Sequence, residues 1–248
     1  MNNKNIARHL RNKIDDWLKT IKDDDIKSII SKNVIITGGA IVSLLNGEQP
    51  KDYDCYFKTE ESCMAIAKYY ATLWNKSNET TVDIRDDCGR ITCFIQSSGI
   101  AENSDMPYDN EDMREPYIED LSDKKQPKYR PKFFSTNAIS LSDKIQIVIR
   151  FYGSVDDIHT NYDFVHCTCS YDYYGNKVSL PSKALESILN KELHYMGSKY
   201  PLCSIIRTRK FIARGYHINA GQYLKMAWQL NQLDLSDTEV LKDQLAGV

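Results

Sequence analysis

The stretch of sequence that decides the fold reads VIITGGAIVSLLNGEQPKDYDCYF, residues 34–57. A short apolar run over 33–37 stops at two adjacent glycines, Gly38 and Gly39, which predicts a buried strand followed by a tight turn. The spacing then predicts a helix over 40–45 and a second strand over 52–57. Adjacent glycines after a strand let the backbone approach a ligand closely, and phosphate suits the free N–H groups of the helix that follows.

Two aspartates lie on the second of these expected strands. Asp52 and Asp54 are two residues apart, so their carboxylates project from one face, while the opposite face carries Tyr53, Cys55 and Phe57. Two carboxylates beside a phosphate cradle repel one another unless cations lie between them, and hard oxygen ligands suit Mg²⁺. Two such ions can activate a hydroxyl and stabilise a leaving pyrophosphate. The alternative interpretation is structural: glycine and aspartate in a turn and at an exposed strand start.

The composition and charge of the chain limit the class of protein that carries this motif. The chain has 248 residues and a formal net charge of −2, so an anion site has to be a local patch. Seven cysteines and a polar, basic start with no apolar signal segment predict free thiols in a reducing, cytoplasmic compartment. No run approaches the roughly 20 apolar residues of a membrane span. Abundant Asn, Ile, Lys and Tyr suit an AT-rich genome such as that of a virus or phage.

The remaining sequence predicts a mixed α/β domain over 1–180 and a helical region over 181–248. A charged segment, 97–132, is acidic over 101–123 and basic over 124–132; it is expected to be a long solvated loop, or a lid over substrate. Further helices are expected over 6–30, 60–74, 155–159, 182–193, 202–215, 220–230 and 237–245, a hairpin over 80–84 and 90–96, and strands over 134–141, 144–151, 162–171 and 177–180.

The motif over 38–57 resembles the nucleotidyltransferase superfamily of the DNA polymerase β type. Gly-Gly, a helix, Gly47, a spacer and Asp-x-Asp look most like the head domain of CCA-adding enzymes and bacterial poly(A) polymerases. The resemblance covers about 25 residues and implies a polymerase β-like mixed sheet flanked by helices, with metal-dependent nucleotidyl transfer. Those enzymes carry Arg-Asp where this chain has Val42-Ser43, and their later basic motif is not recognisable here.

The resemblance also implies a third carboxylate from a later strand, acting as general base or metal ligand. Asp163 in NYDFVHC is the best candidate, and Asp83 in TVDIR competes with it. In the expected helix over 202–215, Arg207, Lys210 and Arg214 fall on one face and could hold a triphosphate or an RNA backbone. The alternative for these cations is a solvated helix face.

Together these features predict an enzyme that moves a nucleoside monophosphate from an NTP to an acceptor hydroxyl. Gly38, Gly39 and Ser43 would hold the triphosphate, and Asp52, Asp54 and Asp163 would bind Mg²⁺. An RNA end, such as a tRNA 3′ end, fits the resemblance best as acceptor. The alternatives are a non-catalytic viral or phage factor that sequesters a nucleotide or blocks a host protein, and a toxin-like transferase that modifies tRNA or protein.

Overall fold

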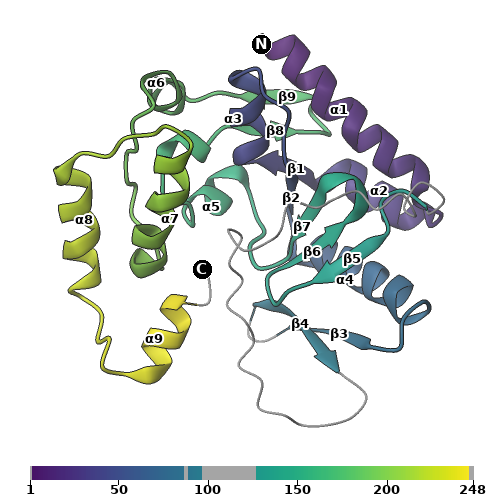
Figure 1. The fold of residues 1–248 in the computed structure, drawn as a ribbon. Helices are drawn as coiled ribbons and strands as arrows, with labels where there is room; N and C mark the ends of the chain where they lie inside the picture. Colours follow the sequence, from purple (N-terminus) through teal and green to yellow (C-terminus); the bar gives the residue numbers. More distant parts are fainter. Residues whose placement is uncertain (1, 87–88, 97–126, 246–248) are drawn as a thin grey trace. The chain divides into compact units, whose positions relative to one another are not determined.

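A computed structural model describes residues 2–86, 89–96 and 127–245. The described residues divide into two compact units (Figure 1). The first unit contains 2–96, 127–159 and 169–180, and the second contains 160–168 and 181–245. The boundary at Pro181 is the one expected for the start of the helical region. The second unit also includes 160–168, which is expected from the sequence to belong to the α/β domain. Most of the charged segment over 97–132 lies outside the described residues.

The chain begins with two helices where the apolar spacing predicts one. These are α1 (Asn3–Thr20) and α2 (Asp24–Asn33). The break has a local cause, because the side chain of Asp23 accepts hydrogen bonds from the backbone N–H groups of Asp25 and Ile26 and so caps a new helix.

The first unit is built on a mixed sheet of seven strands, which confirms the expected mixed α/β fold. The order is β5-β6-β7-β2-β1-β8-β9; β2 pairs with β7 in parallel and the other pairs are antiparallel. The strands are β1 (Val34–Thr37), β2 (Tyr53–Phe57), β5 (Pro131–Phe134), β6 (Ala138–Leu141), β7 (Ile145–Val148), β8 (Ser170–Asp172) and β9 (Lys177–Ser179).

Helices and a small hairpin complete this unit. α3 (Gly39–Leu45) connects β1 to β2, and α4 (Glu60–Asn75) begins at a capping box made by Thr59 and Ser62. The short helix α5 (Val155–His159) lies where it is expected, and the 3₁₀ turn η3 (Ser142–Lys144), which the sequence does not predict, precedes β7. The expected hairpin is confirmed as β3 (Thr81–Asp86) and β4 (Ile91–Gln96), a separate two-stranded sheet that packs on α4.

The second unit is helical among its described residues. It contains the 3₁₀ turn η4 (Val165–Cys167), α6 (Ser182–Asn190), α7 (Pro201–Ala213), α8 (Ala220–Leu230) and α9 (Thr238–Leu245). Its core gathers side chains from the start of η4, the α6–α7 and α7–α8 connections and α8: Phe164, Leu193, Tyr195, Tyr216 and Met226.

Two expected strands are wrong as continuous elements. The run over 162–171 is a 3₁₀ turn followed by β8, because the backbone of Phe164 and Val165 bonds to Tyr195 and His194 instead of to the sheet. The run over 134–141 is divided between β5 and β6, since the Ser135 hydroxyl accepts hydrogen bonds from the backbone and closes a turn. Alternating apolar residues cannot reveal either interruption.

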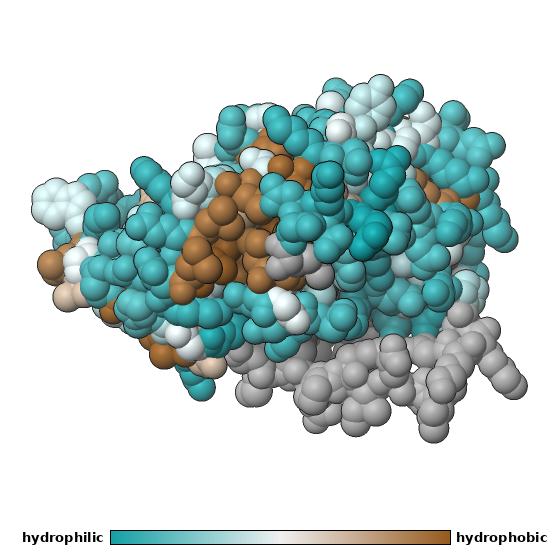
Figure 2. Space-filling view, turned by 90° about the horizontal axis from the view of Figure 1, so that it is seen from above, coloured by the Kyte–Doolittle hydropathy of each residue, from teal (hydrophilic) through white to brown (hydrophobic). Residues whose placement is uncertain are grey.

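The surface is largely hydrophilic on the face seen from above, with one larger apolar area and several smaller ones (Figure 2). Large exposed apolar side chains in the second unit include Leu189, Leu224 and Trp228. No helix among the described residues is long and apolar enough to cross a membrane.

Candidate functional site

The glycine pair occupies the turn between β1 and α3. Gly38 precedes α3 with φ 85° and ψ −142°, a conformation that residues with a side chain rarely adopt. Gly39 has open space where a side chain would begin, because a Cβ atom built there meets nothing within 4 Å. α3 has only seven residues, so contact with a ligand at this turn depends on bare backbone more than on a helix dipole.

The sheet register brings the glycines and the aspartates to the same edge. β1 and β2 are antiparallel with Ile36 opposite Cys55, so the end of β1 lies beside the beginning of β2. Asp54 is half-buried on β2, and Asp52 is exposed immediately before it. The expected opposite face is confirmed, since Tyr53, Cys55 and Phe57 are buried. The structure therefore places both halves of the motif together, although about a dozen residues separate them in sequence.

The strands beside Asp54 carry polar but uncharged residues at the matching register. Gln146 of β7 is the partner of Asp54, and Ser140 of β6 is the partner of Gln146. On the other side, Thr37 ends β1 and pairs with Ser170 of β8. Residues paired in a ladder share one face of the sheet. This row therefore continues Asp54 with amide and hydroxyl groups, and no second carboxylate stands at these four positions.

A histidine that the sequence does not single out lies at this edge. The Thr37 hydroxyl contacts His159 Nε2 at 2.8 Å and donates to the carbonyl oxygen of Cys169 at 2.9 Å. Burial lowers the pKa of His159, which keeps the imidazole neutral at physiological pH. His159 ends α5 and is 122 residues from Thr37, so no local pattern could have found it.

The chemistry of the donors fits one Mg²⁺ ion together with phosphate oxygens. Mg²⁺ commonly takes one or two carboxylate ligands and completes its shell with water and phosphate. Here Asp52 and Asp54 could supply the carboxylates, and a bound triphosphate could supply the phosphate oxygens. Across the part of the chain that the structure describes, no three His, Cys, Asp or Glu side chains gather in a way that could hold a metal ion. A second Mg²⁺ ion would therefore need ligands other than Asp52, Asp54 and the triphosphate.

Asp163, the preferred third carboxylate, lies in the second unit just before η4. The residue is 5% exposed, and its side chain pairs with Arg207, with Oδ2 2.8 Å from Nη1. Burial raises the pKa of Asp163, while the Arg207 charge and hydrogen bonds from Ser204 and Ser198 oppose the shift. Two residues predicted for separate roles thus contact each other as a buried ion pair. A role for Asp163 in proton transfer stays a prediction.

The competing carboxylate, Asp83, lies on β3 of the two-stranded sheet and not on the strands that carry the motif. It is exposed and forms an ion pair with Arg85 at 2.8 Å.

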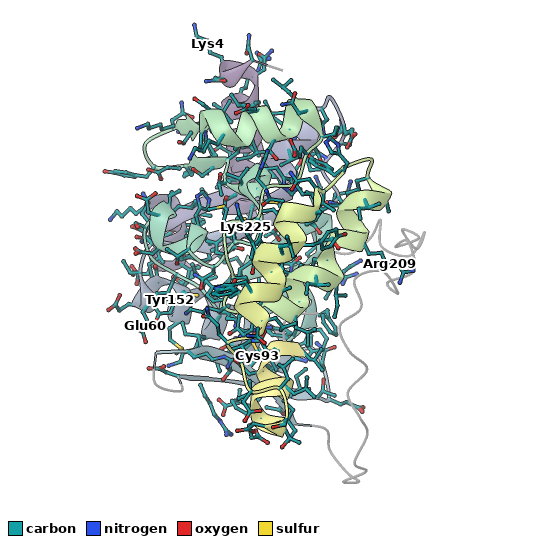
Figure 3. All side chains as sticks on the ribbon, turned by 90° about the vertical axis from the view of Figure 1, so that its left-hand side faces the viewer. Lys4, Glu60, Cys93, Tyr152, Arg209 and Lys225 are labelled. Atoms are coloured by element: carbon teal, nitrogen blue, oxygen red, sulfur yellow. The ribbon has the colours of Figure 1, made fainter. Side chains whose placement is uncertain are left out.

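The other predicted ligands occupy two helices. Ser43 is half-buried in the second turn of α3. Arg207 and Lys210 belong to α7, whereas Arg214 caps its carboxyl end outside the regular helix. Figure 3 labels the neighbouring Arg209, which is exposed on the same helix. Since Arg207 is engaged with Asp163, a triphosphate bound at α7 would have to compete with that pair.

The chain is similar in sequence to a phage protein. A family model described as "Gabija anti-defense 2 family protein" matches residues 8–191. The curated protein "Gabija anti-defense 2" of Bacillus phage SPbetaL7 is 20% identical over 224 residues, covering 90% of this chain. The chain spans only 44% of the length of that relative.

Solved structures with a similar fold include two CCA-adding enzymes. The enzyme of Thermotoga maritima complexed with tRNA has a TM-score of 0.46 at 11% identity, covering 88% of this chain and 45% of that one. The enzyme of Bacillus stearothermophilus in complex with CTP has a TM-score of 0.42 at 13% identity, covering 86% and 44%. At these identities the likeness concerns the fold and not the activity.

Proposed function

Because this chain belongs to the Gabija anti-defense 2 family, we propose that it is a phage factor that counters the Gabija defence, with the β1–α3–β2 edge as a nucleotide-binding site. The family match supports the first part, since it covers residues 8–191 and so includes the whole motif. The geometry supports the second part. Gly38 and Gly39 leave bare backbone at the edge where Asp52 precedes β2 and Asp54 lies near its start.

Binding of an NTP with one Mg²⁺ ion is the activity that these residues support best. The glycine turn would accept the phosphates, and the two carboxylates would hold the ion against them. Bound Mg²⁺ would supply charge neutralisation for the phosphate oxygens. Holding a nucleotide this way requires no general base, and the matching register positions beside Asp54 carry Gln146, Ser140, Thr37 and Ser170.

Nucleotidyl transfer to an RNA or protein acceptor is the second candidate function. It is favoured by the two-residue spacing of Asp52 and Asp54, which in extended backbone would put both carboxylates on one side of the chain beside the glycine turn. Transfer would also need a group that takes the proton of the acceptor hydroxyl. Asp163 and Asp83 were predicted for that role, and each contacts an arginine in the structure.

The test combines infection with biochemistry. The chain would be expressed in a Bacillus strain that carries the Gabija defence, and plaques of a susceptible phage would be counted. We expect the chain to restore plaque formation and the Asp52→Asn/Asp54→Asn double variant to lose that effect. The matched control is Asp24→Asn/Asp25→Asn, which removes two exposed carboxylates at the start of α2. Failure of the unmodified chain to restore plaques would overturn the anti-defence role.

Purified protein separates the two chemical candidates. Equilibrium binding of each labelled NTP with Mg²⁺, followed by measurement of pyrophosphate, distinguishes retention from transfer. Tight NTP binding without pyrophosphate release supports sequestration, whereas label appearing in RNA or protein supports transfer. If neither NTP binding nor transfer occurs while plaques are restored, the nucleotide site is wrong and a protein partner is responsible. Transfer that survives the double Asp→Asn variant would exclude Asp52 and Asp54 as its metal ligands.

A further inference from the structure

The first unit also carries an open pocket whose lining residues lie outside the β1–α3–β2 motif. The pocket has a volume of about 600 Å³ and lies between the amino-terminal half of α1 and the β8–β9 turn. α1 runs beside β9 (Figure 1), and the two elements pack together. Among the described residues that line the pocket, none is acidic. Four are basic: Lys4, Arg8, Arg11 and Lys177.

The helical spacing explains why these cations face outward together. Lys4, Arg8 and Arg11 are at positions i, i+4 and i+7 of α1, which fall on one helical face. The opposite face is fully buried through Ile6, Leu10, Ile14 and Trp17. Burial of that apolar face fixes the rotation of α1 about its axis. The basic stripe then extends for about 10 Å along the helix, and Lys4 projects away from the ribbon (Figure 3).

The carboxylates near this stripe are engaged with other groups. Asp172 forms an ion pair with Lys58 at 2.8 Å, and Asp15 accepts a hydrogen bond from the Tyr173 hydroxyl at 2.5 Å. Arg11 lies over the ring of Tyr173, with its guanidinium carbon 5.1 Å from the ring centre. Within the described residues none of the four cations forms an ion pair with a carboxylate. The pocket is therefore a concentration of positive side chains on a chain whose formal net charge is −2.

An exposed aromatic side chain adjoins the pocket. Tyr174, in the β8–β9 turn directly before Gly175, is 71% exposed. Lys58 Nζ lies 5.9 Å from the centre of its ring, so the ring is flanked by a further cation. Single-stranded nucleic acids are typically bound by a basic groove that follows the phosphates and by aromatic rings on which bases stack.

We propose that the α1/β8–β9 pocket binds the sugar–phosphate backbone of a single-stranded nucleic acid and that Tyr174 stacks on one of its bases. The stripe is long enough for two or three successive phosphates, and Lys177 supplies a contact from the opposite wall. An acidic protein surface would satisfy the cations but would leave Tyr174 without a role. This inference does not depend on the proposed nucleotide site, because it uses different residues.

The test is fluorescence anisotropy with the full chain and labelled oligonucleotides of about 20 residues, oligo(dT) and oligo(U), against a duplex of the same length. We expect both single strands to bind more tightly than the duplex; a preference between the two strands identifies DNA or RNA as the source. Between roughly 50 and 200 mM salt, contacts to three or four phosphates should weaken binding by about 20- to 50-fold.

Variants assign the binding to this surface. Arg8→Glu/Lys177→Glu should weaken binding at least about tenfold through loss of phosphate contacts. Tyr174→Ala should weaken it by about fivefold or more through loss of stacking. The matched control, Lys68→Glu/Lys76→Glu, makes the same change of charge on exposed residues of α4 and its C-cap and should leave affinity unchanged. Circular dichroism checks that every variant is folded.

Several outcomes would overturn the proposal. They are undetectable binding at low salt, an equal loss in the α4 control, equal affinity for the duplex together with no effect of Tyr174→Ala, and competition by polyglutamate as strong as that by oligo(dT). The last result would identify an acidic protein as the occupant. None of these results bears on the plaque assay for the anti-defence role, so the two proposals fail independently.

Discussion

Asp54 and Asp163 are the same type of residue in two different environments. Asp54 is half-buried at the edge of a sheet, next to a glycine turn whose backbone is open to a ligand. Asp163 is 5% exposed within the second unit, and an arginine lies 2.8 Å from its carboxylate. A buried carboxylate needs a partner charge or it becomes protonated, whereas a carboxylate near solvent keeps part of its hydration. The first position suits a ligand, and the second is occupied by a buried ion pair.

Breaking the Asp163–Arg207 pair should have the largest effect. Arg207→Ala leaves the buried carboxylate without its cation and should destabilise the second unit by about 3 kcal/mol, at the low end for buried pairs because the Arg207 side chain is 36% exposed. Asp163→Asn should cost less than about 1.5 kcal/mol, since the amide keeps the polar contacts and Arg207 can turn to water. Hydrogen exchange of α7 measures both. A larger cost for Asp163→Asn than for Arg207→Ala would contradict this account.

The stability of the second unit should also decrease in acid. His166 is 1% exposed among the rings of Phe211 and Tyr216, and burial, with the charges of Arg214 and Lys191, lowers its pKa from 6.5 to about 3. The unfolded chain then takes up a proton first, so stability falls as the pH drops below 6.5, by about 1 kcal/mol per pH unit until the folded-state pKa is reached. The raised pKa of Asp163 acts in the opposite direction.

Substitution of His166 isolates this contribution. In His166→Phe the free energy of unfolding, followed by exchange of α6 and α7, should depend much less on pH between about 6.5 and 4. An unchanged pH dependence would show that other groups cause it.

Alanine substitutions separate the two glycines of the first unit. Gly38→Ala should destabilise the protein by about 1–2 kcal/mol, because φ 85° is strained for alanine. Gly39→Ala should leave stability nearly unchanged, since its Cβ meets nothing within 4 Å. If phosphate occupies that space, Gly39→Ala should nevertheless weaken NTP binding. Urea unfolding and NTP titration of the same samples measure both quantities, and unaltered NTP affinity would place the phosphates elsewhere.

Neutralising Asp52 should have little effect on stability. Because the residue is exposed, Asp52→Asn should change the free energy of unfolding by no more than about 0.5 kcal/mol. This small change in stability would distinguish Asp52 from Asp163, since a carboxylate that binds a ligand affects function without affecting the fold. A loss above about 1 kcal/mol would assign Asp52 a structural role instead.

Much of the first unit is predictable because its signals are local. The apolar run before Gly38, the alternation over 53–57 and the hairpin over 80–96 each depend on neighbours within a few residues, and each element is present. The interruption at Asp23 and the division of 134–141 depend on single side chains that bond to nearby backbone. Such competition is weakly visible in a pattern of apolar residues.

The sequence by itself determined the turn at Gly38–Gly39 and the strand that carries Asp54, because backbone conformation and strand alternation follow from local chemistry. Only the tertiary structure decided which distant groups meet: His159 with Thr37, and Arg207 with Asp163. It also placed the basic stripe of α1 beside the β8–β9 turn. Contacts of this kind arise when apolar faces pack, and packing joins residues that no sequence spacing connects.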